Sequence, residues 1–147
     1  MEQATQVQQK TETKGITVKE ITIEEKQQFD AFIASCAKGH ILQTWEWGEL
    51  KAKTGWKPIR LAAERNGQMV GAISILKRKV PMGSWSIFYA PRGPVLDIED
   101  QEVWESLLHG VKKQAKKHNA IFLKIDPDVK DDNTQWRQRI TQAGFRA

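Results

Sequence analysis

The chain has 147 residues, of which 39% are hydrophobic and 28% are charged, and its formal net charge is +5. This size and composition predict one globular domain with a core of its own, and no apolar run is long enough to cross a bilayer. The amino terminus lacks an apolar leader segment and Cys36 has no second cysteine to pair with, so we expect a cytoplasmic protein. The positive charge favours an anionic partner, such as a nucleic acid, a phosphorylated substrate or an acidic membrane surface.

The first predicted elements in chain order are a tail, a strand and two helices. Residues 1–14 are rich in Gln, Thr, Glu and Lys, so we expect a disordered tail before a domain that spans residues 15–147. Alternating apolar residues at the start of this domain predict a short strand, and Thr22 with Glu25 has the spacing of a helix capping box. The apolar face of the helix that follows consists of Phe29, Phe32, Ile33 and Cys36. Thr44 is a suitable cap for a second, short helix.

A meander of three strands is predicted next. Residues 59–64 and 69–77 flank the pair Asn66-Gly67, which is the strongest short-range signal of a β-hairpin. A second turn at residues 80–84 leads to a strand over residues 85–90.

The loop that follows this strand is the first candidate site. Its prolines at positions 91 and 94 cannot donate to a sheet ladder, so the strand ends there, and Gly93 allows a ligand to approach the backbone. Open α/β sheets bind ligands in such gaps between a strand and a helix. Arg92 either holds a phosphate or carboxylate there, or pairs on the surface with Asp97 or Glu99. The residues alone leave both interpretations open.

A helix, a strand and a last helix complete the chain. Acidic residues from Asp97 onward open the helix and lysines end it, which matches the helix dipole. Its apolar stripe consists of Val103, Trp104, Leu107, Leu108 and Val111. Residues 120–126 predict a strand, and because a helix precedes it, we expect parallel pairing with strand 85–90. The last helix covers about residues 133–143, and residues 144–147 resemble the start of one more strand.

This order of elements predicts an α/β (α+β) fold, with a mixed central sheet, helices on both faces and an incomplete final strand. It is similar to the order in the GNAT acyltransferase superfamily. In that superfamily the acyl donor enters between the last meander strand and the parallel strand that follows.

Four motifs narrow the comparison. They are Gln43-Thr-Trp-Glu-Trp-Gly-Glu-Leu-Lys51, Gly55-Trp56, Tyr89-Ala-Pro-Arg-Gly-Pro-Val-Leu-Asp97 and Leu123-Lys-Ile-Asp-Pro127. In this order and spacing they resemble the FemABX family of peptidoglycan bridge-forming aminoacyltransferases, over about residues 41–147.

The resemblance implies an acyltransferase of cell-wall biogenesis and cell shape. Its members transfer an amino acid from aminoacyl-tRNA to the stem peptide of a lipid-linked or UDP-linked peptidoglycan precursor, and they need no cofactor. They have two GNAT-like domains, of which this chain matches the first. The second domain, which makes most of the tRNA contacts, is absent here, so we expect these residues alone to be inactive. The expected partners are the precursor, aminoacyl-tRNA and the inner membrane surface at its periphery.

The resemblance also implies site residues, each with a simpler alternative. Lys51 matches the lysine that contacts the precursor's phosphates, and otherwise it is a solvated helix lysine. Asp126 matches a candidate base for the attacking amine, and otherwise it caps the turn after its strand. Trp45 and Trp47 cannot both face the interior of a regular helix, and Tyr89 lines the cleft or joins the core. The candidate substrate-binding residues are Lys51, Arg92, Gly93, Trp47 and Tyr89.

Two other functions are weighed against this one. An acetyl-CoA enzyme needs a glycine-rich loop for the pyrophosphate, but the sequence here is Arg92-Gly-Pro-Val-Leu-Asp97, in which a proline removes a donor and an aspartate adds negative charge. A basic module that binds nucleic acid is supported by the lysines at positions 112, 113, 116 and 117. The scattered histidines predict no metal site.

Overall fold

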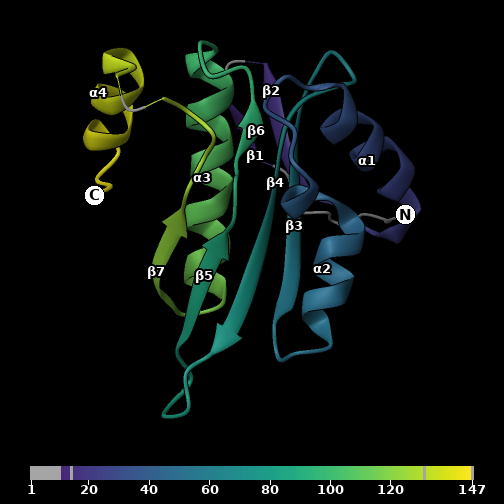
Figure 1. Ribbon diagram of the computed structural model, residues 1–147, viewed down its shortest axis with the longest axis vertical. Coiled ribbons are helices and arrows are strands. Elements are labelled where there is room, and N and C mark those ends of the chain that lie inside the picture. The colour runs from purple at the N-terminus through teal and green to yellow at the C-terminus, as the bar shows by residue number, and fades with distance from the viewer. Residues whose placement is uncertain (1–10, 14, 131, 147) are drawn as a thin grey trace, which may run out of the picture.

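The computed structural model describes residues 11–13, 15–130 and 132–146 (Figure 1). Its strands are β1 (Thr11–Thr13), β2 (Ile16–Glu20), β3 (Lys57–Arg65), β4 (Gln68–Lys79), β5 (Ser86–Ala90), β6 (Val95–Leu96) and β7 (Ala120–Ile125). Its α-helices are α1 (Lys26–Ser35), α2 (Trp45–Ala52), α3 (Gln101–Lys117) and α4 (Thr134–Gln142). Two short 3-10 helices, η2 (Ile23–Glu25) and η3 (Ile41–Gln43), precede α1 and α2.

The strands form one mixed sheet. Within the described residues their order is β1-β2-β3-β4-β5-β7, and β6 pairs with β4. Every pair is antiparallel except β5 and β7, which run parallel from Ser86 with Ala120 to Ala90 with Ile125. The predicted mixed sheet and its parallel pair are therefore confirmed.

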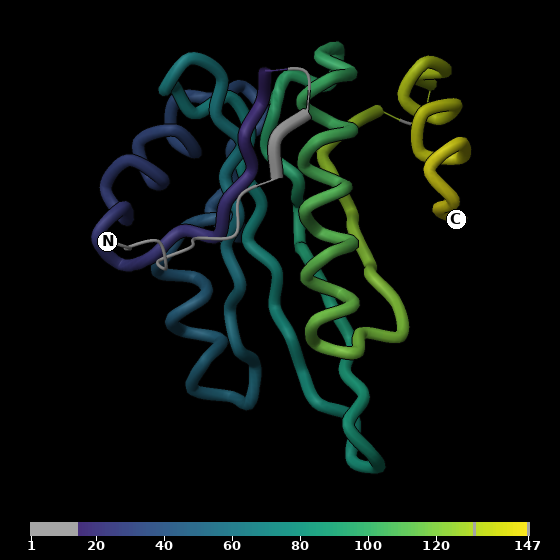
Figure 2. The backbone as a smooth tube through the Cα atoms, turned by 180° about the vertical axis from the view of Figure 1, so that it is seen from behind, coloured from purple at the N-terminus to yellow at the C-terminus, as the bar shows by residue number. Residues whose placement is uncertain are grey.

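Helices cover both faces of this sheet. Helix α3 crosses one face, and α1 and α2 lie on the other (Figure 2). The core under α3 is the larger, and includes Ile16, Leu61, Ile73, Phe88, Val103, Trp104 and Leu107. The core on the opposite face includes Ile21, Phe29, Ile33, Trp45 and Val95. Phe32 and Cys36 are partly buried against this second core, in agreement with the predicted apolar face of α1.

Caps and turns form where the local sequence predicts them. The backbone N–H of Thr22 donates to the Glu25 carboxylate at 3.4 Å, and the Thr44 hydroxyl accepts from an N–H in the first turn of α2. Asn66 and Gly67 have φ of 53° and 79°, the left-handed values that a two-residue hairpin turn requires.

Four sequence expectations need correction. Residues 11–13 form β1 against β2, although a disordered tail was expected over residues 1–14; the rest of that tail lies outside the described residues. Residues 95–96 form β6, a strand too short to leave an alternating pattern. As a result α3 begins at Gln101, capped by Asp100, and not at Asp97. Residues 144–146 form no strand, and residue 147 is outside the described part.

Strand β7 lies at an edge of the sheet, and α4 stands beside it (Figure 1). Trp136 of α4 packs on Trp104 of α3, with ring centroids 5.0 Å apart. Between β7 and α4 lies an open hollow of about 630 Å³, whose walls include Phe122, Ile125 and Ile140. The motifs gave no sign of this hollow.

Candidate functional site

The loop after β5 and the end of β7 meet at one carboxylate. Asp126 follows β7 directly, and its Oδ1 accepts a hydrogen bond from the Arg92 backbone N–H at 2.6 Å. Its Oδ2 accepts from the Tyr89 hydroxyl at 3.2 Å. Parallel pairing of β5 and β7 brings these three residues to the same edge of the sheet. Three of the predicted site residues therefore form one cluster, which we call the Asp126 cluster.

Tyr89 is half-buried in this cluster. Burial raises the pKa of its hydroxyl, and the nearby Asp126 carboxylate raises it further. The hydroxyl therefore keeps its proton and acts as a donor to Asp126. The Lys124 ammonium lies 5.2 Å from the centre of the Tyr89 ring, which places a second cation beside the cluster.

Arg92 presents an exposed side chain on a constrained backbone. Its φ is 57°, in the left-handed region that residues other than glycine, asparagine and aspartate rarely adopt. Among the described residues its guanidinium forms no ion pair with Asp97 or Glu99, so the surface pairing considered from the sequence is not present. The planar fork is left facing solvent, where it can accept a phosphate or carboxylate.

The buried side chain of Gln43 is hydrogen-bonded to the start of the Arg92 loop. This fully buried amide donates from Nε2 to the backbone oxygens of Ser74 at 3.1 Å and Pro91 at 2.7 Å, and its Oε1 accepts from the Ser74 N–H at 2.8 Å. A Cβ built on Gly93 would lie 2.8 Å from Gln43 Nε2. Gln43 therefore makes a close approach at Gly93, which explains why a side chain does not fit there.

The role of Gln43 was missed, although the residue opens the first motif. A glutamine between an apolar residue and a capping Thr44 is the available signal, because a buried amide must find partners for both of its ends. Its partners lie 31 and 48 residues away in the sequence, so no local pattern could identify them.

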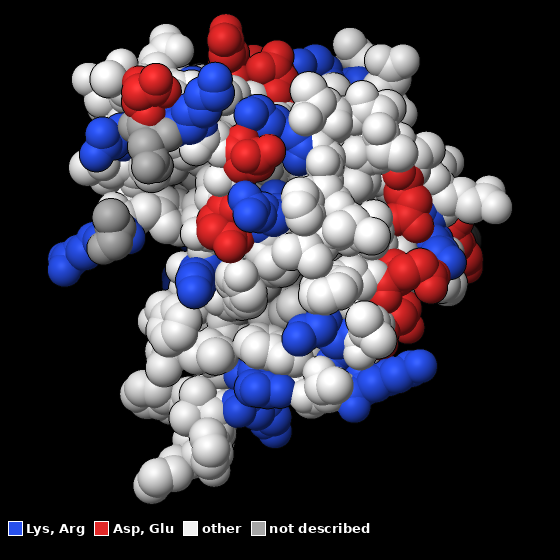
Figure 3. All heavy atoms as spheres, viewed as in Figure 1, with Lys and Arg blue, Asp and Glu red and all other residues white. Residues whose placement is uncertain are grey.

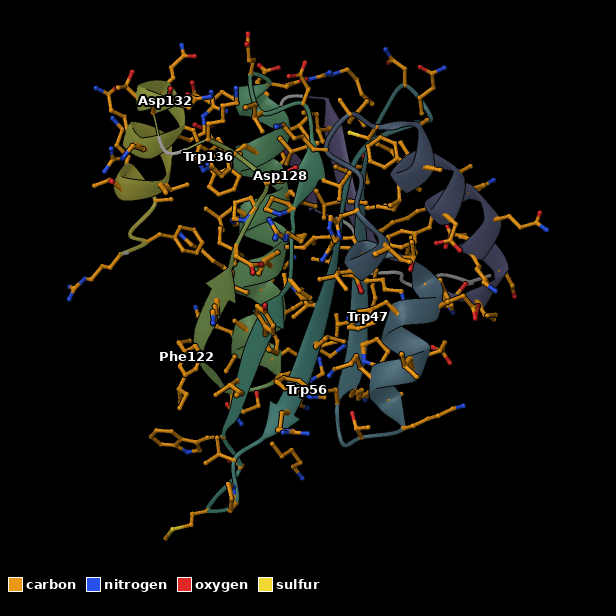
Figure 4. All side chains as sticks on the ribbon, viewed as in Figure 1. Trp47, Trp56, Phe122, Asp128, Asp132 and Trp136 are labelled. Atoms are coloured by element: carbon orange, nitrogen blue, oxygen red, sulfur yellow. The ribbon has the colours of Figure 1, made fainter. Side chains whose placement is uncertain are left out.

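Helix α2 carries the other two candidates, Trp47 and Lys51. Trp47 is half-buried on this helix (Figure 4). The Lys51 ammonium lies 5.8 Å from the centre of the Trp47 ring. Trp45 is the tryptophan that faces the core, and the Arg60 guanidinium stacks 3.6 Å from its ring. Lys51 lies in the last turn of α2, about 10 Å along the helix from Thr44.

The amino terminus of α3 is already occupied by the chain's own carboxylate. Asp100 accepts from the Val103 N–H at 3.2 Å and pairs with Arg65 at 3.1 Å. These two bonds and the Arg65 charge outweigh the effect of burial and hold the pKa of Asp100 below its usual value. Asp97, Glu99 and Glu102 add negative charge around it. This helix end is therefore unsuited to a pyrophosphate.

Neither a metal site nor a membrane span is found in the part of the chain that the structure describes. No three His, Cys, Asp or Glu side chains lie close enough together to bind an ion. None of the helices described combines the length and the apolarity that crossing a bilayer requires.

Comparisons with known proteins identify the family. The model of the FemAB family matches residues 25–145. Lipid II:glycine glycyltransferase of Staphylococcus aureus is 38% identical over 121 residues, which are 82% of this chain and 29% of that protein. The crystal structure of FemX superposes with a TM-score of 0.80 at 36% identity, over 88% of this chain and 32% of that one.

More distant structures share the fold alone. A ribosomal-protein-alanine N-acetyltransferase from Brucella melitensis biovar Abortus 2308 superposes with a TM-score of 0.62 at 13% identity, over 88% of this chain and 92% of that one. The fold is thus that of the GNAT acyltransferases. Within this fold, the chain belongs to the FemAB family. It spans about 29% of the length of the curated relatives that it matches.

Proposed function

We propose that this chain forms the first domain of an aminoacyltransferase that extends the stem peptide of a peptidoglycan precursor, with aminoacyl-tRNA as the donor. Membership of the FemAB family carries the proposal, since a relative at 38% identity is named as a glycyltransferase acting on lipid II. The second domain and most contacts to the tRNA are proposed to lie outside these residues. The cytoplasm is the proposed location of this protein, because the peptidoglycan precursor and aminoacyl-tRNA meet there.

The proposed precursor site runs from α2 to the Asp126 cluster. Lys51 is a point charge suited to one phosphate of a diphosphate, and Arg92 offers a planar fork to a phosphate or carboxylate. The rings of Trp47 and Tyr89 give the sugar or peptide an apolar surface between these charges. Gly93 contributes by letting Gln43 hold the loop in place.

Asp126 is the proposed base of the reaction. The acceptor ammonium gives one proton to the carboxylate, and the resulting amine attacks the ester carbonyl of aminoacyl-tRNA, so that a C–N bond forms. The ester C–O bond then breaks, and a second proton from the attacking nitrogen goes to the leaving oxygen, which is released as the tRNA hydroxyl. Asp126 is exposed, and each of its oxygens accepts one hydrogen bond and has a lone pair left. These bonds also make it a positioning residue for Arg92.

Three observations count against acyl-CoA as the donor. Asp100 caps the helix end where a pyrophosphate would bind. Strands β5 and β7 are paired as far as Ala90 with Ile125, so no gap separates them for the arm of a cofactor. The loop between them and α3 contains β6, whose N–H groups belong to a strand and are not free to surround phosphates.

An NMR titration tests the proposal. A UDP-linked muropeptide should shift the amide signals of both α2 and the Arg92 loop, whereas acetyl-CoA should shift neither. Arg92→Gln should weaken this binding about tenfold, as expected for one charge-assisted contact, while the matched control Lys112→Gln on α3 should bind as before. Saturable binding of acetyl-CoA at the Arg92 loop would contradict the proposal and favour an ordinary acetyltransferase.

A further inference from the structure

The end of the molecule opposite the Asp126 cluster exposes apolar side chains. There the hairpin between β4 and β5 projects beyond the rest of the sheet (Figures 1 and 2). In its turn, residues 80–85, Met82 is 81% exposed and Trp85 is 54% exposed. We call this turn the hairpin tip. Large apolar groups on a projecting turn mark an interaction site.

A second apolar pair lies beside the base of the hairpin. Ile121 and Phe122 are 49% and 53% exposed, although they are consecutive residues of a strand. The register of β7 against β5 shifts here: Ser86 pairs with Ala120, but Phe88 pairs with Leu123. This bulge explains why two neighbouring side chains are both exposed.

The hairpin tip is held in a defined shape. The Val80 N–H donates to the Trp85 backbone oxygen at 2.9 Å, which closes the turn. The Asn119 amide donates to the Ser84 backbone oxygen at 3.4 Å, and the Ser86 hydroxyl donates to the His118 backbone oxygen at 2.8 Å. These bonds tie the hairpin to the end of α3, so the exposed residues belong to a built surface.

Cations surround the base of the hairpin. They come from three elements and are Lys57 of β3, Lys77, Arg78 and Lys79 of β4, and Lys116 and Lys117 of α3. Lys57 pairs directly with Lys77 across the sheet. Burial is the main cause that lowers the pKa of His118, and the charges of Lys77, Lys117 and Lys57 lower it further, so these three lysines lie near one another around its ring.

No carboxylate balances these cations within their own segments. Residues 50–63, 65–96 and 106–125 contain neither Asp nor Glu. The face in Figure 3 shows the result, since its lowest part carries basic and uncharged atoms while the acidic groups lie higher. On this face of the molecule, basic side chains therefore gather at one end.

We propose that this end docks on the surface of an anionic lipid bilayer, with the hairpin tip among the acyl chains and the cations at its base on the lipid phosphates. The order along the hairpin matches the order across a bilayer surface: Met82 is at the turn, Trp85 follows at the depth that tryptophan prefers, and Lys79 and Arg78 come behind. RNA would also be attracted by the cations. Trp85 offers RNA a ring for stacking, but RNA would gain little from Val80 and Met82 at the turn, which have neither a side-chain donor nor an aromatic ring.

The docked orientation also selects between two carriers. Arg78 donates to the Thr54 backbone oxygen at 2.6 Å, so the end of α2 that carries Lys51 is tied to the base of the hairpin. Lys51 then lies on the bilayer side of the Asp126 cluster, as the diphosphate of a lipid-linked precursor requires. This choice of a lipid-linked over a UDP-linked precursor rests on the proposed function, whereas the docking surface does not.

Vesicle co-sedimentation without any precursor tests the surface alone. The chain should bind vesicles of phosphatidylglycerol and phosphatidylethanolamine, bind phosphatidylcholine vesicles at least about tenfold more weakly, and be partly released by salt. Met82→Ser should weaken binding about tenfold, and Lys79→Glu with Lys116→Glu should weaken it at least as much. The control Ile23→Ser removes an equally bulky, 65% exposed residue on η2 and should bind like the parent chain.

Two results would overturn the docking surface. One is equal binding of the parent chain and Met82→Ser to anionic vesicles. Because Met82 is 81% exposed, this substitution should leave the fold intact, and the comparison then reports on the surface alone. The other is that the parent chain binds an unrelated RNA, and that the hairpin variants lose this RNA binding but still bind vesicles. The vesicle experiment contains no precursor, so a negative result does not affect the NMR test of the proposed function. A negative NMR titration likewise does not affect the vesicle experiment.

Discussion

Gln43 is the side chain on which the position of the Arg92 loop depends. Gln43→Ala leaves the Ser74 N–H and the oxygens of Ser74 and Pro91 buried without partners, so the free energy of unfolding should fall by about 2–4 kcal/mol. Urea denaturation measures this loss. Gln114→Ala is the matched control, since its buried Oε1 has no partner among the described residues, and it should cost less. Equal losses in the two variants would show that the Gln43 bonds contribute little.

Arg92 illustrates a site residue that costs stability. A left-handed backbone costs a non-glycine residue roughly 1–2 kcal/mol, while the freedom of glycine in the unfolded chain costs about 0.5–1 kcal/mol. Arg92→Gly should therefore fold at least as stably as the parent chain, yet bind the muropeptide about tenfold more weakly.

Thermal melting and the NMR titration measure these two effects separately. Asn66→Gly, which relieves a φ of 53° in a distant hairpin, should raise stability without changing affinity. If Arg92→Gly binds the muropeptide as tightly as the parent chain, the Arg92 guanidinium does not contribute to the binding site.

At the scale of single residues, the sequence predicted which residues lie together, but it did not predict the hydrogen bonds that join them. Tyr89, Arg92 and Asp126 were candidates because a loop and a strand end were placed at one sheet edge, and the structure joins them by hydrogen bonds. The donor to Asp126 is the Arg92 backbone, which no residue type reveals. Gln43 could not be assigned, since its partners are backbone atoms far along the chain.

The contact between α3 and β4 should make stability depend on pH. Lys77 Nζ lies 2.9 Å from Nδ1 of His118, so the neutral imidazole accepts a hydrogen bond. Burial lowers the pKa of His118 from its ordinary 6.5, and the surrounding lysines lower it further. Between the folded pKa and 6.5 the unfolded chain binds more protons, so the free energy of unfolding should fall as pH drops through this window.

Urea denaturation at a series of pH values measures this dependence. His118→Gln should flatten the curve below pH 6.5, because the group that gains a proton on unfolding is gone. The matched control is His109→Gln, on an exposed site of the same helix, which should keep the slope of the parent chain. A slope that survives His118→Gln would assign the pH dependence to other groups.

The long, periodic elements were predicted well, and the short ones were not. The stripe of α3, the Asn66-Gly67 turn and the caps of η2 and α2 are each determined by neighbours in the sequence. β1 and β6 are short and exist because a neighbouring strand offers free backbone groups. Pairing of that kind is a tertiary effect, and composition alone suggested a tail at residues 11–13.

At the scale of the whole molecule, we predict that the chain folds cooperatively but does not transfer amino acids by itself. Holding acceptor amine and donor ester together contributes roughly 7–11 kcal/mol to such a reaction. The Asp126 cluster and Lys51 form only one wall of that arrangement, and the chain spans 29% of its curated relative.

Mass spectrometry of precursor incubated with the chain and aminoacyl-tRNA should therefore show no added residue. A longer protein that also contains the proposed second domain should restore the addition, and Asp126→Asn in that context should reduce the rate more than it reduces precursor affinity. Turnover by these 147 residues alone would refute the division of the site between two domains.

The parallel pairing of β5 with β7 also sets an order of folding events. The β3–β4 hairpin closes around a two-residue turn, whereas β7 reaches β5 only after the chain has passed through the whole of α3. Closing a longer loop is slower, so the β5–β7 contact should form late. During synthesis the apolar side chains of β5, Phe88 above all, then wait uncovered until α3 and β7 have left the ribosome, which makes this interval the most vulnerable to misassembly.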